Sequence, residues 1–489
     1  MSRFPRNALV PMILAFLAAT APTAKAAPPN VVWIIVDDMS AEFSCYGEKT
    51  ITTPHVDRLA REGTLFRKAF TTAPVCSPCR SALITGMYQT SIGAQNHRSG
   101  RGDEKINLPG GVVPVPVLFQ RAGYFTCIGG PLGGGKALGK TDYNFEWDRA
   151  MYDGSDWAAR KSGQPFFMQV QLHGGKNREG KNWDETVRRE LGEPTDPKSV
   201  TLPPYYPRDP VLLDDWARYL DTVRLTDKQV GDVLRRLESE GILDETLVIF
   251  MTDHGISHAR GKQFLYDEGI HVPLVVRGPG IPKGKVRDDL VEQIDLAAIS
   301  LAFAGLPVPL GMQGRDVFAK DYAPRDAVFS ARDRCDETIE HIRGVRTDRY
   351  KYIRNGYPAR PLLQPNRYKD NKEIIKRLRE LHEEGRLDAL QERLLFAPTR
   401  AKEELYDLTA DPFELTNLAA DPQHRETLET LRRRSELWSD VTGDRGREPE
   451  PWSMYDSDMR TYLRTRTDAQ SDVLRANIAL MKKWAAEGK

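Results

Sequence analysis

Residues 30–38 read NVVWIIVDD, in which six consecutive apolar side chains precede two carboxylates. An unbroken apolar run, rather than an alternating one, is typical of a strand that is buried on both faces of a parallel sheet. Three later runs share this form and lie at 165–175, 246–255 and 271–280. A helical pattern occupies 214–238, between two of these runs. Strands that alternate with helices predict an α/β domain.

Two of these runs end in ionisable side chains. Asp37 and Asp38 close the first run, and Asp253 and His254 close the run at 246–255. Ligands collect at the carboxyl ends of the strands in such sheets. Carboxylate oxygens suit calcium or magnesium better than zinc, although a pair of adjacent aspartates can also simply cap a helix. We expect these four side chains to form a metal site.

The balance of charge gives no support to nucleic-acid binding, because 70 basic residues face 69 acidic ones and the net charge is +1. Residues 1–26 have the form of a secretory signal peptide: Arg3 and Arg6 precede a short apolar run, and a cleavage-type triplet follows it. No later stretch approaches the roughly 20 apolar residues of a membrane helix. We therefore expect an exported, soluble protein, periplasmic or secreted, that binds neither nucleic acid nor membrane.

The pattern changes past the last of the apolar runs. Residues 344–355 alternate in the manner of an antiparallel strand. Residues 371–395 are charged and helical, and 403–422 are rich in turn residues. We expect a larger unit over 28–330 and a smaller α+β domain over 331–489.

A Cys-x-x-Cys lies in VCSPCRSALITG at 75–86, where Cys76 and Cys79 flank Ser77 and Pro78. This spacing fits a redox pair, half of a zinc site or neither. Zinc would need a second ligand pair at similar spacing, which the sequence lacks. The other three cysteines are scattered singly, so the total of five forms no disulfide framework. On spacing alone, the redox pair stays open.

Six motifs follow in order along the chain. They are NVVWIIVDDMS (30–40), CSPCRSALITG (76–86), AGYFT with GKTDYNF (122–126 and 139–145), TDHG (252–255), RGKQFLYDEGIHVPLVVRGPG (260–280) and EELYDLTADPFELTNLA (403–419). Together they resemble the motifs of the type I sulfatases in the alkaline phosphatase superfamily, and most of all the heparan N-sulfatase-like and polysaccharide sulfatases. The resemblance implies an α/β fold with a large mixed sheet sandwiched by helices, and a smaller C-terminal α+β domain.

The resemblance also implies a chemistry. In the family's C-x-P-x-R signature, Cys76 would be oxidised to formylglycine by a formylglycine-generating enzyme, and Cys79 would be a tolerated variant. One hydroxyl of the hydrated aldehyde can attack sulfur, and the sulfated intermediate can then collapse to the aldehyde. The four strand-end residues would hold calcium, with magnesium as the alternative. Arg80, Lys140 and Lys262 would surround the sulfuryl oxygens.

Some assignments stay open. Lys136 competes with Lys140 for the place of the first active-site lysine, because a Gly-rich insertion precedes both. Asp142 stands where many sulfatases carry a histidine, two residues after that lysine. The acid that protonates the leaving group is His173 or Lys176, and His173 is favoured.

The sequence thus predicts an enzyme that hydrolyses sulfate esters or an N-sulfate in a sulfated carbohydrate. His97, Arg98, Lys176 and Arg332 are its expected substrate contacts, although salt-bridged surface loops would explain some of these residues equally well. Two alternatives remain. One is a phosphodiesterase or phosphonate monoester hydrolase of the same superfamily, and the other is a catalytically silent glycan-binding relative.

Overall fold

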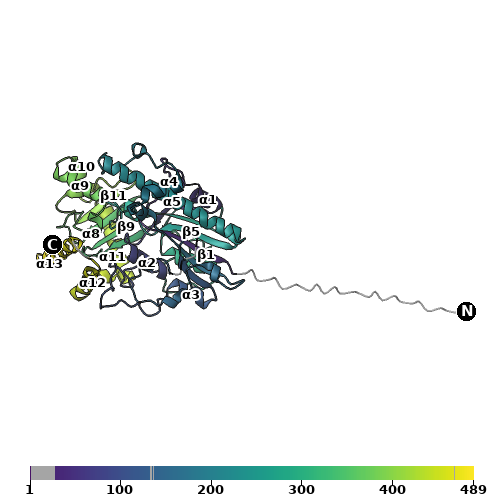
Figure 1. Ribbon diagram of the computed structural model, residues 1–489. Coiled ribbons are helices and arrows are strands. Elements are labelled where there is room, and N and C mark those ends of the chain that lie inside the picture. The colour runs from purple at the N-terminus through teal and green to yellow at the C-terminus, as the bar shows by residue number, and fades with distance from the viewer. Residues whose placement is uncertain (2–27, 133–134, 136, 467–468) are drawn as a thin grey trace.

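The computed structural model describes residues 1, 28–132, 135, 137–466 and 469–489 (Figure 1). Residues 2–26 of the expected signal peptide, and Lys136, lie outside the described residues. Among the described residues, none of the helices combines the length and apolar character that a bilayer crossing requires.

A seven-stranded sheet forms the larger part of the molecule, in the order β3-β4-β1-β5-β6-β2-β7. Its strands are β1 (Asn30–Val36), β2 (Thr64–Phe70), β3 (Phe125–Gly129), β4 (Phe166–Leu172), β5 (Thr246–Thr252), β6 (His271–Arg277) and β7 (Lys285–Glu292). The central strand β1 pairs in parallel with β4 and β5, and its last residue, Val36, lies level with Leu172 and Thr252. The residues that follow these three strands therefore meet at one edge of the sheet.

The sheet is mixed, as the family resemblance implies. Strand β6 runs antiparallel to both β5 and β2, although its continuous apolar run favoured a parallel strand. All of β6 except its first residue is buried, and burial on both faces produces such a run whichever way the strand points. The apolar run thus reports cover by helices, not direction.

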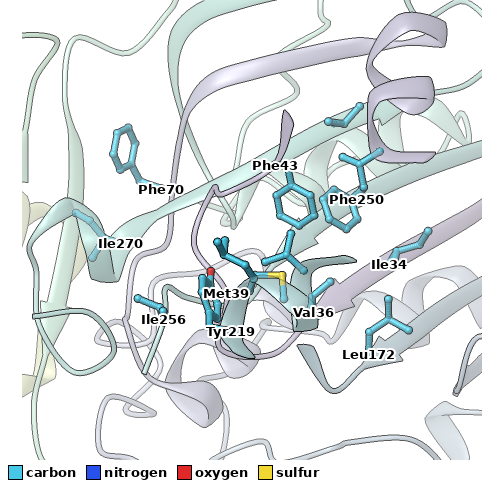
Figure 2. Close-up of a cluster of buried hydrophobic side chains, with 14 of the residues drawn as sticks. Ile34, Val36, Met39, Phe43, Phe70, Leu172, Tyr219, Phe250, Ile256 and Ile270 are labelled. Carbon is cyan, nitrogen blue, oxygen red and sulfur yellow. The ribbon is translucent and has the colours of Figure 1, made fainter. Parts of the chain in front are cut away.

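Helices cover both faces of the sheet, so β1 belongs to two cores. Val32, Ile34 and Val36 pack in a cluster with side chains of α1 (Pro54–Glu62) and α5 (Pro210–Ser239), part of which is drawn in Figure 2. The alternate residues of β1 pack in a second cluster with α2 (Cys76–Thr85), α3 (Val115–Arg121) and α7 (Asp295–Phe303). Figure 1 shows α1 and α5 on one side of β1 and β5, with α2 and α3 on the other.

The helical pattern at 214–238 forms the interior of α5, which begins four residues earlier. Pro210 occupies its first turn, and the side chain of Asp209 accepts a hydrogen bond from the Val211 N–H, so both residues define the start.

A second, antiparallel sheet has the order β11-β10-β9-β8. Its strands are β8 (Val328–Arg332), β9 (Ile342–Arg346), β10 (Tyr350–Asn355) and β11 (Glu403–Asp407). The remaining α-helices are α4 (Trp183–Leu191), α6 (Asp267–Ile270), α8 (Arg367–Asp370), α9 (Glu373–Glu383), α10 (Ala389–Gln391), α11 (Arg425–Thr442), α12 (Trp452–Arg464) and α13 (Ala469–Ala486). The expected boundary between the larger unit and the smaller domain, at residue 330, falls inside strand β8. We propose that the chain divides near this strand.

Truncation of the fully buried Val32 to alanine should lower the free energy of unfolding by about 2–3 kcal/mol, because it removes two methyl groups and leaves a cavity. The matched control is Val286→Ala in β7, where the side chain is 42% exposed and the expected change is within about 0.5 kcal/mol. Urea denaturation measures both. Equal losses in the two variants would contradict the central position of β1.

Candidate active site

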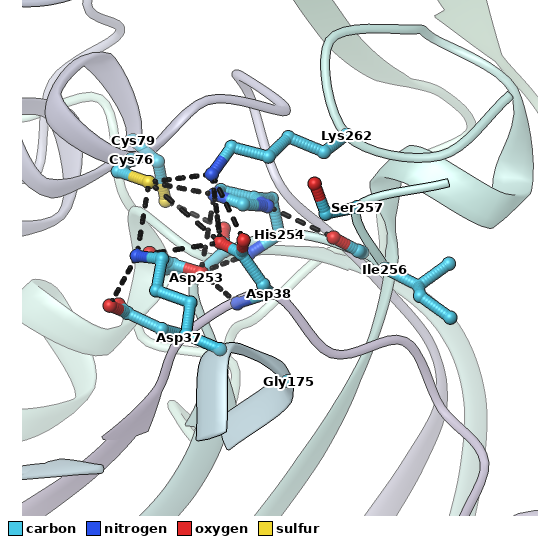
Figure 3. Close-up of polar contacts among 12 residues, drawn as sticks. Asp37, Asp38, Cys76, Cys79, Gly175, Asp253, His254, Ile256, Ser257 and Lys262 are labelled. Atoms are coloured by element: carbon cyan, nitrogen blue, oxygen red, sulfur yellow. Dashed lines mark hydrogen bonds and ion pairs between the residues drawn. The ribbon is translucent and has the colours of Figure 1, made fainter. Parts of the chain in front are cut away.

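Four neighbouring strands deliver charged side chains to one edge of the large sheet. Asp37 and Asp38 follow β1, and Asp253 and His254 follow β5. Lysines arrive from the segments after β3, β4 and β5, in the order Lys140, Lys176 and Lys262. Figure 3 shows the side chains of Asp37, Asp38, Asp253, His254 and Lys262 gathered near Cys76, the first residue of α2.

Two glycines bring Lys176 into this group. Strand β4 is followed by the 3-10 helix η4 (Gly174–Glu179), which packs directly on the Asp37–Asp38 segment. A Cβ on Gly174 would lie 2.2 Å from the carbonyl oxygen of Asp37, and one on Gly175 would lie 2.1 Å from that of Asp38. Because no side chain fits there, these positions need glycine.

The thiol of Cys76 lies among cations. Its Sγ is 3.2 Å from Lys262 Nζ, 3.2 Å from His254 Nε2 and 3.7 Å from Lys176 Nζ. Burial opposes ionisation, but the charges of Lys140, Lys176 and Lys262 hold the pKa of this thiol well below its usual value. The group is therefore a thiolate at neutral pH.

Cys79 has the opposite environment. Its Sγ donates to the Asp253 carbonyl oxygen at 2.8 Å, and burial raises the pKa of the thiol. All five cysteines are free. The two cysteines therefore differ: Cys76 is held as a thiolate, and Cys79 stays protonated with its hydrogen engaged by the Asp253 carbonyl oxygen.

Asp37 is held by three cations. Lys140 Nζ lies 3.0 and 2.9 Å from its two oxygens, Lys176 Nζ lies 2.6 Å away, and Arg80 also donates to it. Burial raises its pKa, but these cations outweigh that effect, led by Lys140, and the pKa falls well below its usual value. Asp37 is thus ionised throughout the physiological range.

Asp38 is held from a different side. Lys262 Nζ donates to its oxygens at 2.9 and 3.1 Å, and the Tyr368 hydroxyl donates at 3.0 Å. Burial again opposes the charge, but Lys176 and Lys262 lower the pKa of this carboxyl. His254 Nε2 lies 3.4 Å from Asp38 Oδ1, so Asp38, Cys76 and His254 present ligand atoms that all lie within 4.8 Å of one another.

The surroundings of the Asp253 carboxylate suit a divalent cation. Its Oδ1 accepts the backbone N–H groups of Asp38 at 3.1 Å and His254 at 2.9 Å. Its Oδ2 is buried and has no hydrogen-bond partner within the described part of the chain, with Arg80 at 3.4 Å and Lys140 Nζ at 3.9 Å as its ion-pair neighbours. Burial raises the pKa of Asp253 to about 6. An unfilled carboxylate oxygen beside two further carboxylates is the environment that a divalent cation completes.

Several predicted residues lie apart from this cluster. His173 is exposed at the start of η4, and no hydrogen bond or ion pair joins its ring to any described residue. His97 is buried, and its Nδ1 lies 3.4 Å from Asp336 Oδ1. Burial lowers the pKa of His97, but the negative charge of Asp336 outweighs that effect and raises the pKa to about 10. Arg332 is buried and donates to Gln263 at 3.4 Å.

Arg98 lies close to the start of α2 instead. Its backbone N–H donates to Ser77 Oγ at 2.8 Å, with a φ of 54° that is uncommon outside glycine. Its side chain is exposed.

Sequence reasoning missed Tyr368, in α8. Its hydroxyl donates to Asp38 and accepts from Lys262 Nζ at 3.3 Å. It lies 330 residues from Asp38 along the chain, and the surrounding sequence RYKD (367–370) carries no motif. No local signal could have identified it.

Known proteins resemble this chain over most of its length. The Sulfatase family model matches residues 29–306, and the model described as N-sulphoglucosamine sulphohydrolase, C-terminal, matches 254–395. An ulvan-active sulfatase of Formosa agariphila is 31% identical over 466 residues, which cover 86% of this chain and 76% of that protein. The N-sulphoglucosamine sulphohydrolase of Homo sapiens is 29% identical over 479 residues, which cover 88% and 92%.

A solved structure shares the fold. It holds its protein in complex with the substrate D-glucosamine-2-N,6-O-disulfate, and it superposes with a TM-score of 0.58 at 20% identity, covering 85% of this chain and 98% of that one.

In protein that carries Cys76 as a thiol, iodoacetamide at pH 6 should alkylate Cys76 and spare Cys79. The lowered pKa of Cys76 favours its reactive thiolate form, whereas the raised pKa of Cys79 keeps that thiol protonated. Peptide mass spectrometry over a time course measures both sites. Equal labelling of the two thiols would contradict the electrostatics described above.

Proposed function

We propose that this chain, which belongs to the sulfatase family, removes sulfate from an O-sulfated or N-sulfated carbohydrate. The observation that carries the proposal is the setting of Cys76: the first residue of a helix, with Lys176 and Lys262 within 3.7 Å of its Sγ. A helix N-terminus and fixed cations both attract an anionic group. Two relatives that cover 86% and 88% of the chain are named ulvan-active sulfatase and N-sulphoglucosamine sulphohydrolase.

The nucleophile in this proposal derives from Cys76. A formylglycine-generating enzyme would convert it to formylglycine, and the Sγ atom marks the place of the resulting oxygen. The hydrated aldehyde would supply one hydroxyl to attack sulfur and a second hydroxyl for release of sulfate. The setting of Cys76 at a buried helix start, with Pro78 and Arg80 after it, supports this assignment.

Calcium, or magnesium as the alternative, would be held by Asp37, Asp38, Asp253 and His254. The cation would supply positive charge that lowers the pKa of the attacking hydroxyl. Its support is the unfilled Oδ2 of Asp253. His254 is an unusual calcium ligand, and its Nε2 also faces the nucleophile position at 3.2 Å.

The chain's own cations would bind the sulfuryl group. Lys140 holds Asp37, and Lys262 holds Asp38 and lies 3.2 Å from Cys76 Sγ. Arg80 is fixed by Asp37 and Gln171, so it offers a charge that needs no reorganisation during the reaction.

Lys176 is the better of the two expected acids. Its Nζ lies 3.7 Å from Cys76 Sγ, whereas the exposed ring of His173 makes no hydrogen bond or ion pair with any described residue. Burial disfavours its charge, but the neighbouring carboxylates, led by Asp38, raise the pKa of Lys176 above its usual value. It therefore holds a proton at neutral pH, and a departing alkoxide or amide anion is basic enough to take it.

The proposal also covers the location of the protein and its maturation. The signal-like residues 1–26 support export to the periplasm or outside the cell, and maturation would require the formylglycine-generating enzyme. His97, Arg98 and Arg332 remain proposed substrate contacts, with Arg98 the one whose exposed side chain supports the role.

Turnover of a panel of defined O- and N-sulfated saccharides tests the function, with 4-nitrophenyl sulfate and bis(4-nitrophenyl) phosphate beside it. We expect the sulfated substrates to be hydrolysed with the higher kcat/KM. Higher kcat/KM on the phosphate diester would favour the phosphodiesterase alternative. An absence of turnover in protein with formylglycine at position 76 would favour a silent glycan-binding relative.

Cys76→Ser should be nearly inactive, because a serine can accept sulfate but cannot release it through an aldehyde. Cys79→Ser should stay active, which a redox pair would not allow. Mass spectrometry of active protein should find an aldehyde at residue 76, trapped by a hydrazine reagent. An intact thiol there in fully active protein would contradict the mechanism.

Asp37→Ala should abolish activity and metal content together. Full metal occupancy in the Asp37→Ala variant would contradict the assignment of the metal to this site.

Tyr368→Phe should weaken calcium binding by about 10- to 100-fold, because it removes the hydroxyl that orients the Asp38 carboxylate. Calorimetric titration with calcium measures the affinity. The control is Tyr350→Phe in β10, a tyrosine of the second sheet whose hydroxyl makes no hydrogen bond among the described contacts.

Lys176→Ala should slow the hydrolysis of saccharide sulfates by on the order of 10²–10⁴ and that of 4-nitrophenyl sulfate much less, because a nitrophenolate leaves without a proton. His173→Ala serves as the control. Equal slowing of both substrates by Lys176→Ala would show that this lysine is not the acid.

A further inference from the structure

The segment that carries Lys262 has no regular secondary structure. It runs from the end of β5 at Thr252 to the start of α6 at Asp267. Gln263, directly after Lys262, has a φ of 80°, which is uncommon for a residue other than glycine. Strained backbone of this kind persists only where the surrounding structure holds it. The place of Lys262 is therefore set by contacts from elsewhere in the fold.

Lys369, in α8, makes two such contacts. Its side chain is 2% exposed, and its Nζ donates at 2.8 Å to the carbonyl oxygen of His258 and at 2.8 Å to that of Lys262. The two carbonyl groups belong to residues four positions apart. One amine therefore ties together both ends of the stretch 258–262.

Charge balance does not explain why a lysine is buried here. No carboxylate of the described residues forms an ion pair with Lys369, and the ring of Phe264 lies 4.7 Å from its Nζ. Burial, followed by the charge of Arg332, holds the pKa of Lys369 well below its usual value. A neutral amine has two hydrogens to donate, and the two backbone carbonyl groups accept both. The side chain thus serves the backbone of the segment.

The neighbours of Lys369 hold the same segment. The Tyr368 hydroxyl lies 3.3 Å from Lys262 Nζ, and Asn366 Oδ1 accepts a hydrogen bond from Gln263 Nε2 at 3.3 Å. Asn366 also caps α8, because its side chain accepts the Lys369 N–H at 3.0 Å. Residues 366–369 therefore contact Lys262 at its backbone and at its ammonium, which lies 3.2 Å from Cys76 Sγ (Figure 3).

We propose that Lys369 is a positioning residue that acts through Lys262: it holds the backbone of 258–262 so that the Lys262 ammonium faces the nucleophile at position 76. The inference rests on the proposed function for the role of Lys262 and deepens it. Because α8 lies beyond β8, where we divide the chain, the smaller domain sets the geometry of a charge in the larger unit.

A double-mutant cycle tests the proposal. Lys369→Met removes the N–H donors and keeps an unbranched side chain of similar length in the buried space. It should lower kcat on the best saccharide sulfate by about 10- to 100-fold, because a misplacement of about 1 Å can cost that much. Lys262→Ala should lower kcat by on the order of 10²–10³. In the double variant, Lys369→Met should add less than about threefold to that loss, because it acts through a side chain that is gone.

Alkylation gives a second measurement that does not depend on turnover. In protein that carries Cys76 as a thiol, Lys262→Ala should slow the reaction of Cys76 with iodoacetamide, because it removes a cation that stabilises the thiolate. Lys369→Met should slow the reaction as well, with Lys262 still present. Peptide mass spectrometry over a time course measures both rates.

Two further variants serve as controls. Lys369→Gln keeps two N–H donors on a shorter side chain and should lose less activity than Lys369→Met. It takes the place of Lys369→Met in the cycle where melting shows that variant to be unfolded. Lys376→Met in α9 removes a lysine whose side chain is 47% exposed, and it should change neither kcat nor the alkylation rate.

The outcomes separate the inference from the function on which it rests. Losses in kcat that multiply in the double variant would show that Lys369 acts on the fold in general, and would overturn the inference while leaving the sulfatase intact. Wild-type kcat and alkylation in Lys369→Met would overturn it as well. A wild-type enzyme that hydrolyses no sulfated substrate would overturn the proposed function, and the alkylation rates would then decide whether Lys369 holds Lys262 beside Cys76.

Discussion

The structure depends on a balance of buried opposite charges at the carboxyl end of β1. Asp37, Asp38 and Asp253 are almost fully buried, and each would be costly to bury alone. The cations that offset them are Lys140, Lys176 and Lys262, from segments after different strands, and Arg80, the fifth residue of α2. Removal of any one partner leaves an uncompensated charge in a site with little access to water. The loops are therefore held in place by the same electrostatics that prepare the site for an anion.

The positions and burial of β1, β4, β5 and β6 could be predicted from sequence, because an apolar run reports its surroundings directly, whereas β2, β3 and β7 have no such run and the stretch at 344–355 forms two strands rather than one. The edge where Asp37 and Asp253 meet followed from the same patterns, since parallel neighbours end together. The direction of β6 did not follow, because a strand covered on both faces has the same composition in either orientation. Tyr368 could not be found either, because its contact with Asp38 depends on how the second sheet docks against the first.

The competition between His173 and Lys176 shows another limit of sequence reasoning. The two residues lie three positions apart, at the start of η4 and within it, and the sequence places both near the end of β4. Only the close approach of Gly174 and Gly175 to the Asp37–Asp38 backbone decides which side chain turns inward. A tight turn of this kind has no periodicity, so its geometry is fixed by tertiary contact.

The register of β1 also governs where the chain can vary in length. Successive residues of β1 serve two different cores, so one inserted residue would exchange the faces of every side chain after it. The same insertion would carry the aspartates past the ends of β4 and β5 by about 3.3 Å, the rise of one residue in a parallel strand. Insertions and deletions should therefore be excluded from β1, β4 and β5, and from the segments after the strands that carry Lys140, Lys176 and Lys262. Only connections that carry none of the site's charged side chains remain free to vary in length.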